Sequence, residues 1–358
     1  FEQMHMDDAI YADESIYEYP MQQGGGNDGR PYSFGRPSSG GSKAAYPCKS
    51  YGQGRINPAY FYGVFDPNDM RRDVSITMTG SNGKGVEKLI PFVPNSKAEG
   101  GGLTLNKWDE NRQANPWVAA QRKSGINGPY MRMSEVYLGY AEVCAALGDV
   151  VTGKQYLKTV RERSFPQGLA NTDAFIASFG NDLVRAIIEE RGFEYAGEGD
   201  RRWTLIRSGY LPKDIKRIKD MTKAMMDGLA TKGYYEFENG NIISAYIWTK
   251  LVDAKTIYGH RLTAQCPTDK VNDPVLYPGW RGQKDNWEEM GLNYGSSTPA
   301  TNLAIKGLFE IVSEEEAASL ESQGYAKVNW GIDLVDYRDE YDKYLFWDYD
   351  YVSAPIYL

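Results

Sequence analysis

The sequence predicts a mainly α-helical protein in which a helical scaffold carries an irregular, loop-rich region and short β-hairpins. Apolar residues recur at helical spacing from residue 130 onward, which is typical of amphipathic helices. Residues 1 to about 60 contain too many Gly and Pro residues for long helices. Two apolar runs that flank Asn239-Gly240 predict a hairpin with a type I′ turn.

The clearest helical signal is a predicted pair of helices over residues 130–147 and about 152–163, with Gly148 ending the first helix. Two helices in roughly 34 residues resemble a tetratricopeptide unit. The small residues Ala141 and Gly153 would let the two helices approach closely. The apolar residues that we assign to the core face of the first helix are Met133, Val136, Tyr137, Tyr140, Cys144 and Leu147.

Two longer helices are predicted after this pair. We expect one over residues 172–195 and another over residues 212–232. In the first of these, Leu183, Ile187 and Glu194 are expected to face inward. Gly197 and Gly199 end the first of these helices.

Composition divides the chain into three segments of one domain. Residues 1–128 form a loop-rich segment, and residues 129–233 form the helical core. Residues 234–358 combine the hairpin, aromatic loops and a C-terminal tail. Within this last segment, Ser313 and Glu316 form a capping box that predicts the start of a short helix.

Composition also excludes several classes of function. The net charge of -8 and a pI near 5.1 argue against nucleic-acid binding, which needs an excess of Lys and Arg. No apolar run approaches the ~18 residues of a membrane span. Two His residues exclude a His-rich metal site, and the three Cys residues have no zinc-binding spacing. The 27 Tyr and 8 Trp residues offer apolar faces with polar edges, which suits sugar and peptide recognition.

The segment from Ile187 to Arg207 is dense in charge and is interrupted by glycines. We predict that it forms a hydrogen-bonded ion network at a helix end, because buried charges persist only when they are paired. Gly197 and Gly199 allow the chain to reverse tightly, and Trp203 is expected to pack the network down. The predicted members of the network are Glu190, Arg191, Glu194, Arg202 and Arg207.

Four elements in this order carry a family resemblance. They are Phe65 to Arg72, Pro129 to Glu142, Val160 to Arg163 and Glu190 to Arg207. Together they resemble the motifs of the SusD/RagB family. The last element departs from the family pattern at Thr204, where the family usually has Asp. Its matching residues are Glu190, Arg191, Glu194, Glu198, Gly199, Arg202, Trp203, Leu205 and Arg207.

The resemblance implies a tetratricopeptide-like scaffold with an irregular ligand-binding face. It also implies a lipoprotein on the outer surface of the outer membrane of Bacteroidetes. Such proteins sit as a lid over a TonB-dependent transporter of the SusC type and bind oligosaccharides, or in some cases peptides, without catalysis or a cofactor. The resemblance places this chain in the C-terminal part of the family. The lipid anchor and the first helix pairs are expected in an N-terminal half that this chain does not contain.

Nothing in the family motifs assigns the ligand-binding residues, so they follow from chemistry alone. Aromatic rings stack on the C–H faces of sugars, and Arg and Asn hydrogen-bond to their hydroxyls. The long loop over residues 276–294 combines these side chains, although its rings could equally hold the loop in place. The predicted ligand-binding residues are Tyr277, Trp280, Arg281, Asn286, Trp287 and Tyr294, and a second candidate patch is Tyr60, Phe61 and Tyr62.

Other functions remain open alternatives. The protein could be a structural lid or scaffold of a transporter complex, or a peptide-binding member of the family. A glycoside hydrolase would need paired carboxylates such as Glu189 and Glu190, but we assign no catalytic residue. Asp269, Asn272 and Asp273 could ligate Ca²⁺, although they lack a complete calcium-binding pattern, and we assign no metal site.

Overall fold

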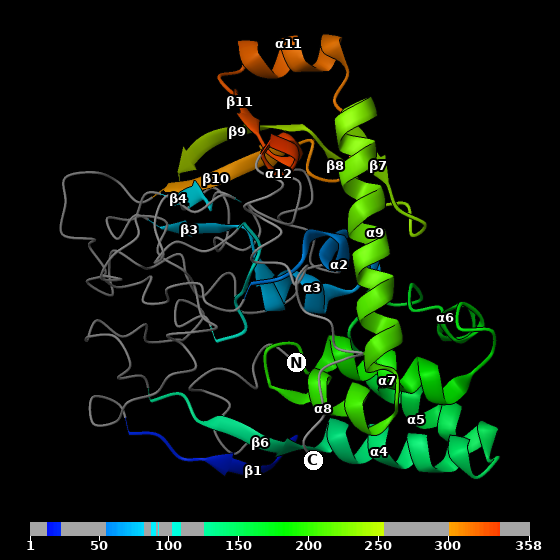
Figure 1. The fold of residues 1–358 in the computed structure, drawn as a ribbon. Coiled ribbons are helices and arrows are strands. Elements are labelled where there is room, and N and C mark those ends of the chain that lie inside the picture. Colours follow the sequence, from blue (N-terminus) through cyan, green and yellow to red (C-terminus); the bar gives the residue numbers. More distant parts are fainter. Residues whose placement is uncertain are drawn as a thin grey trace.

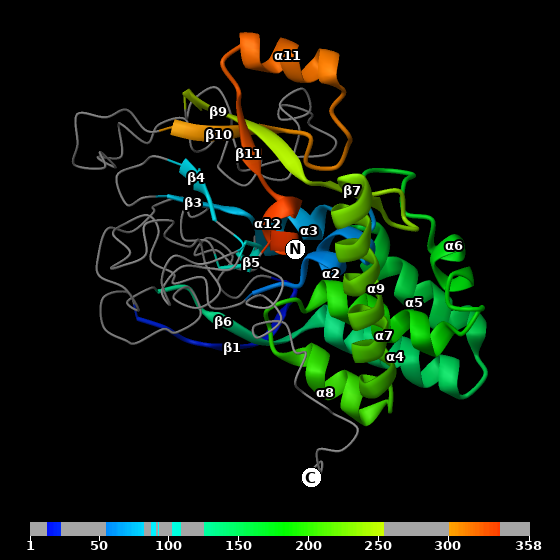
Figure 2. The ribbon, with the colours of Figure 1, turned by 45° about the horizontal axis from the view of Figure 1, so that its top comes forward.

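The computed structural model confirms a mainly helical protein with several small sheets (Figure 1). One group of helices and one group of short strands lie at opposite ends of the long helix α9, Leu211–Lys232 (Figures 1 and 2). In the described parts of the chain, no helix is both long and apolar enough to cross a membrane. The structure describes residues 13–22, 55–81, 87–90, 92, 102–108, 125–253 and 301–336.

The predicted helix pair is present as α4, Met133–Ala146, and α5, Val150–Glu162. The helix α7, Leu183–Glu194, packs against both of them. Gly153 lies so close to α4 that an added Cβ would stand 3.0 Å from the backbone oxygen of Ala141. The small residues therefore bring the two helices together, as the sequence predicts.

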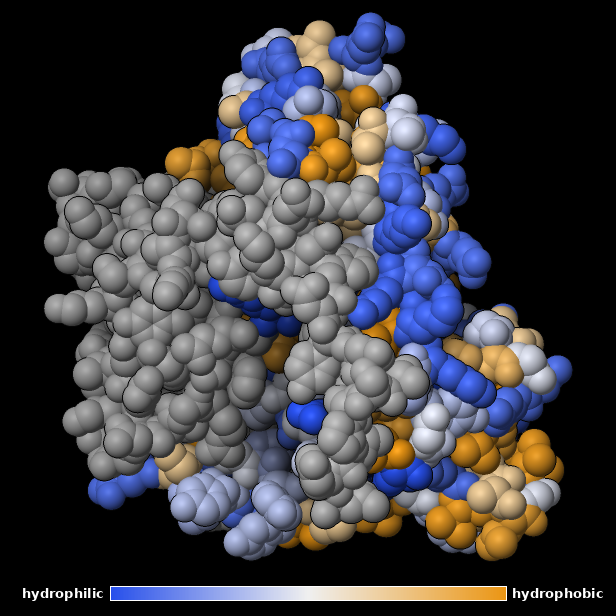
Figure 3. Space-filling view, viewed as in Figure 1, coloured by the Kyte–Doolittle hydropathy of each residue, from blue (hydrophilic) through white to orange (hydrophobic). Residues whose placement is uncertain are grey.

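The buried face of α4 differs from the predicted one. Its buried residues are Ser134, Leu138, Ala141 and Cys144, so only Cys144 belongs to both sets. Tyr140, which we expected in the core, is 49% exposed. The helix is apolar on two opposite sides, and periodicity cannot tell which side packs. The exposed apolar residues from α4 to the start of α5 are Val136, Tyr140, Val143, Leu147, Val150 and Val151. Hydrophobic surface, coloured orange, gathers at the lower right of Figure 3, where these two helices meet.

The start of α4 is also later than predicted. Residues from Gly128 to Arg132 form the strand β6, which pairs antiparallel with β1, Ser15–Tyr19. The partner strand lies more than a hundred residues earlier in the chain. Local spacing could not reveal this pairing.

The predicted helix over residues 172–195 is two helices, α6, Thr172–Ala177, and α7. Gly180 and Asn181 break the helix because both have left-handed backbone angles, with φ of 66° and 64°. Asp182 then caps α7 by accepting a hydrogen bond from the backbone N–H of Arg185 at 3.0 Å. Gly-Asn-Asp thus combines a stop and a start signal that the apolar periodicity concealed.

The hairpin is confirmed, but its predicted turn type is wrong. The strands β7, Tyr234–Glu236, and β8, Ile242–Ser244, enclose a five-residue loop rather than a two-residue one. Only Gly240 in this loop has a positive φ, of 83°. A type I′ turn needs positive φ at both central residues. The Asn239 side-chain amide instead donates hydrogen bonds to the backbone oxygens of Tyr62 and Phe65, at 2.8 and 2.9 Å.

A second core lies between the helix α2, Pro58–Gly63, the helix α9 and the strands. Phe61 and Tyr62 are fully buried there, and Trp330 donates a hydrogen bond to the Tyr62 hydroxyl at 2.9 Å. Tyr60 packs against the same core. The alternative prediction that these three rings form a ligand patch is therefore wrong, since they face the interior.

The remaining elements complete the fold. Ser313 caps α11, Glu314–Ser322, through its hydroxyl and the backbone N–H of Glu316, as predicted. The largest sheet has the antiparallel order β10-β9-β11. The other elements are α3 (Met70–Ser75), α8 (Asp200–Arg207), α12 (Gly331–Asp336), β2 (Ile76–Thr77), β3 (Thr79–Ser81), β4 (Glu87–Leu89), β5 (Thr104–Leu105), β9 (Tyr246–Asp253), β10 (Thr301–Lys306) and β11 (Ala326–Asn329).

Candidate functional site

The six predicted ligand-binding residues of the loop over residues 276–294 lie outside the described residues. The same holds for Asp269, Asn272 and Asp273, the candidate calcium ligands. Among the residues that the structure describes, no group of three or more His, Cys, Asp or Glu side chains is arranged to hold a metal ion. The geometry that can be described lies in the four sequence elements that carry the family resemblance.

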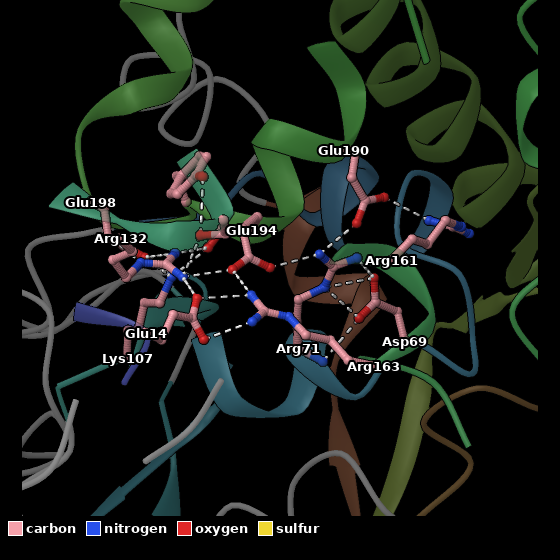
Figure 4. Close-up of polar contacts among 12 residues, drawn as sticks. Glu14, Asp69, Arg71, Lys107, Arg132, Arg161, Arg163, Glu190, Glu194 and Glu198 are labelled. Carbon is pink, nitrogen blue, oxygen red and sulfur yellow. Dashed lines mark hydrogen bonds and ion pairs between the residues drawn. The ribbon is translucent and has the colours of Figure 1, made fainter. Parts of the chain in front are cut away.

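These four elements converge on one buried group of charges, which we call the Glu194 cluster (Figure 4). At its centre, the Glu194 carboxylate faces three arginines. One oxygen lies 2.6 Å from Arg132 and 2.5 Å from Arg163, and the other lies 3.0 Å from Arg71. The members of the cluster are Glu14, Asp69, Arg71, Lys107, Arg132, Arg161, Arg163, Glu190, Glu194 and Glu198.

Arg71 links two carboxylates of α7 to the start of α3. Its guanidinium contacts Glu190 at 2.6 Å and Glu194 at 3.0 Å. It also binds Asp69 through Nε and a terminal nitrogen, at 2.9 and 2.7 Å. Asp69 in turn caps α3 by accepting from the backbone N–H of Arg71. The resemblance element from Phe65 to Arg72 thus has a structural role.

Glu198 holds the opposite side of the cluster. Arg132 contacts both of its oxygens, at 2.8 and 3.0 Å, and the Lys107 ammonium also pairs with it. Burial lowers the pKa of Lys107 to about 8, although the negative charge of Glu198 opposes this effect. Lys107 further donates to the backbone oxygen of Glu194 at 2.8 Å. The end of α7 is therefore fixed by side chains from two distant segments.

The Glu194 cluster balances five cationic against five anionic side chains, which explains how so many charges are buried together. Burial alone would raise the pKa of Glu194, but Arg132, Arg163 and Arg71 lower it far below its ordinary value. Removing one partner from such a group leaves an uncompensated buried charge. The cluster therefore holds β6, α3, α5 and α7 in one arrangement.

A second buried cluster, which we call the Glu189 cluster, lies where α7 meets α8 and α9. Arg185, Arg201 and Arg217 each contact both Glu189 and Asp214, at 2.8 to 3.0 Å. Burial raises the pKa of Glu189, but these three guanidinium groups outweigh it and lower the pKa to about 2.

A glycine makes room for this second cluster. A Cβ at Gly192 would stand 2.8 Å from a terminal nitrogen of Arg201 and 3.2 Å from the Tyr60 hydroxyl. Only glycine therefore leaves Arg201 free to reach Glu189 across the surface of α7.

Arg191 contacts α8 rather than either cluster. Its guanidinium contacts the Asp200 carboxylate at 2.5 Å. Residue 204, where the family resemblance would place an Asp, is a threonine and offers Arg191 no carboxylate. The Thr204 hydroxyl instead lies 3.3 Å from Arg191 Nε and donates to Asp200 at 3.0 Å. Asp200 thus supplies the carboxylate, and the departure at Thr204 leaves Arg191 paired.

Two more predicted members of the charged network, Arg202 and Arg207, lie elsewhere, and so does the tryptophan that was expected to cover it. Trp203 is 67% exposed and does not cover the network, and Arg202 is also exposed. Arg207 pairs at the surface with Glu142 at 2.5 Å. The helix α8 begins only at Asp200, after Gly199 with a φ of 92°. This start turns Thr204 and Leu205 inward and the bulky Trp203 outward.

The clusters do not have the chemistry of a hydrolytic site. Glu189 and Glu190 are adjacent in sequence but point into different clusters, where arginines pair with both. Both carboxylates are buried. A general acid must hold a proton near neutral pH, whereas the pKa of Glu189 is about 2. Both carboxylates therefore serve to hold elements of the fold together through their arginine partners.

Sequence reasoning missed several members of both clusters. Lys107, Arg201 and Asp214 were not singled out, although charged residues beside the motif were a visible signal. It also missed exposed tyrosines on the ribbon formed by β1 and β6. Tyr17, Tyr19 and Tyr130 are 57%, 60% and 78% exposed.

Fold and site together define a helical scaffold protein whose charged motif residues hold its elements in place. The model of the SusD family matches residues 8–258, well over half of the chain. The chain therefore belongs to the SusD family. No curated protein matches the chain.

Solved structures similar to the chain come from Bacteroides. A SusD homolog from Bacteroides thetaiotaomicron VPI-5482 has 21% identity, a TM-score of 0.41, and coverage of 60% of this chain and 44% of its own. Surface glycan-binding protein A from Bacteroides thetaiotaomicron, in complex with laminarihexaose, has 17% identity, a TM-score of 0.43, and coverage of 60% and 46%. A SusD-like protein from Bacteroides fragilis NCTC 9343 has 15% identity and a TM-score of 0.44, and the match covers 60% of this chain and 47% of that protein. The chain thus matches less than half the length of each.

Proposed function

We propose that this chain is part of a surface-exposed outer-membrane protein that captures oligosaccharides and passes them to a TonB-dependent transporter of the SusC type. The observation that supports the proposal is the match of the SusD family to residues 8–258. The proposed protein is attached to the membrane by an N-terminal lipid anchor. It binds its ligand without chemical conversion, in keeping with the structural role of the described carboxylates.

Titration calorimetry with a panel of oligosaccharides tests the proposal. Laminarihexaose, maltohexaose, cellohexaose and xylohexaose are suitable probes, each measured with Ca²⁺ and with a chelator. We expect at least one of them to bind with a Kd of about 1 mM or lower, which corresponds to roughly -4 kcal/mol. If unrelated peptides bind and all oligosaccharides fail, the protein is a peptide-binding member of the family.

The alternative of a structural lid or scaffold has its own supporting observation. Val136, Tyr140, Val143 and Leu147 form an exposed apolar stripe along α4. Contiguous apolar surfaces of this kind are typical of protein–protein contacts. A stable complex with the transporter, combined with no binding of any oligosaccharide or peptide, would favour this alternative.

A further inference from the structure

The ribbon of β1 and β6 presents an aromatic surface that has no role in the described packing. Tyr17 and Tyr19 lie on the outer face of β1, because Glu18 between them is buried. Tyr130 of β6 is the most exposed of the three tyrosines. The rings of Tyr17 and Tyr130 meet edge to face, with centroids 5.8 Å apart and an interplanar angle of 87°.

We infer that Tyr17, Tyr19 and Tyr130 form a platform that binds an oligosaccharide chain, an inference that depends on the proposed function. A sugar ring has apolar C–H faces and a rim of hydroxyls, and tyrosine offers the complementary apolar face and a polar edge. Tyr17 and Tyr19 are two positions apart along the strand, about 7 Å, which is comparable to the length of one sugar unit. The ribbon lies at the lower edge of Figure 1, beside α4, and Figure 3 shows the surface of the same region.

The charges of the ribbon point away from this platform. Glu18 is buried and accepts a hydrogen bond from the side-chain amide of Asn127 at 2.9 Å. Arg132 is buried in the Glu194 cluster. The outward side chains are all uncharged, in a protein of net charge -8. The outward side chains are Ile16, Tyr17, Tyr19, Tyr130 and Met131. A neutral polyhydroxylated ligand matches this surface better than a charged one.

The backbone beneath the rings is held in place, which reduces the entropic cost of binding. The carboxylate of Glu14 contacts Arg132 at 2.9 Å, and its backbone oxygen accepts from the N–H of Met133 at 2.8 Å. At the other end of the ribbon, Asn127 accepts a hydrogen bond from the backbone N–H of Met21 at 2.9 Å. Both ends of the platform are thus tied to the scaffold.

Alanine variants of the exposed tyrosines test the inference with the same oligosaccharide panel. We expect Tyr17→Ala or Tyr130→Ala to raise the Kd of the bound hexasaccharide about two- to tenfold, and the double variant to raise it more than about tenfold. Tyr17→Phe keeps the ring and should lose little affinity. Tyr140→Ala removes a half-exposed tyrosine from α4 and is the matched control, with an unchanged Kd. Circular dichroism confirms that each variant is folded.

The possible failures are distinguishable. If the unmodified chain binds an oligosaccharide and the double variant binds it equally well, the platform is wrong while the proposed function stands. If the unmodified chain binds none of the four hexasaccharides, the proposed function fails and the platform fails with it. If the double variant only reduces self-association in sedimentation experiments, the surface is a contact between two copies, which also overturns the inference.

Discussion

At the scale of single residues, the position of Glu194 shows what the family motif achieves. Each of its carboxylate oxygens meets at least one arginine, and the side chain has no exposure to solvent. Desolvation of an isolated carboxylate would cost several kcal/mol. The surrounding cations offset that cost only while all of them remain in place, so the cluster specifies one geometry for the four segments it joins.

We predict that Glu194→Gln lowers the free energy of unfolding by about 3–5 kcal/mol, because it leaves Arg132, Arg163 and Arg71 without their shared carboxylate. Urea unfolding followed by circular dichroism measures the change. The matched control is Glu142→Gln, which removes the surface partner of Arg207. Exposed ion pairs contribute little, so the control should lose less than about 1 kcal/mol. Equal losses in the two variants would contradict the structural role of the cluster.

At the scale of elements, the close contact of α4 and α5 depends on a single position. A Cβ at Gly153 would stand 3.0 Å from the backbone oxygen of Ala141 and 3.2 Å from the backbone nitrogen of Ala145. Backbone atoms of a packed helix move only if the whole helix moves. Gly139, in the middle of α4, has no atom within 4 Å of such a Cβ.

We predict opposite effects for Gly153→Ala and Gly139→Ala. The first should lower the free energy of unfolding by about 1–3 kcal/mol, because overpacking outweighs the gain in helix propensity. The second should raise it by up to about 1 kcal/mol, since only the propensity changes. Thermal unfolding of both variants measures the difference. Stabilisation by Gly153→Ala would show that the two helices are less tightly packed than the structure describes.

The success of sequence reasoning about elements depended on how local each signal was. The end of α4 and the cap of α11 were predictable because Gly148 and Ser313 act within one helical turn. The strand β6 was not, because its partner lies more than a hundred residues away. The buried side of α4 was assigned wrongly, because Tyr140 and Leu138 fit the helical period equally well on opposite sides.

In the candidate site, too, residues close together in sequence were predictable and their partners from distant segments were not. The motif near α7 identified Glu190 and Glu194 as charged members of a buried network, and the structure confirms this. Their partners Arg71 and Arg132 come from two other segments, and nothing in local spacing pairs them with α7. The order of the family elements was the only signal that joined them. The ligand-binding role of the aromatic loop stays a prediction.

At the scale of the whole molecule, α7 joins the two hydrophobic cores. Ile187 lies in the core between α4, α5 and α7, and Phe193 lies in the core around α2 and α9. The charged clusters occupy the other sides of the same helix. Because both cores and both clusters share α7, we expect the described fold to unfold as one cooperative unit.

The shared helix also makes the stability of the whole molecule sensitive to acid. The pKa of Glu189 is about 2 in the folded protein, against an ordinary value of 4.5, and the pKa of Glu194 and of Glu14 is lowered too. A carboxyl group with a lowered folded pKa stabilises the protein above its unfolded pKa, and this stabilisation is lost as the pH falls through the folded pKa. The contribution of Glu189 is roughly 3 kcal/mol.

We therefore predict that the free energy of unfolding stays near its neutral value above about pH 5 and decreases steeply between about pH 4.5 and 2, the window set by the unfolded and folded pKa values. Urea unfolding at a series of pH values measures this dependence. Glu189→Gln should be less stable at pH 7 but should lose less stability on acidification, because one titrating group is gone. A wild-type protein that keeps its full stability at pH 2.5, or a variant with an equally steep loss, would contradict the assignment of Glu189 as an ionised structural group.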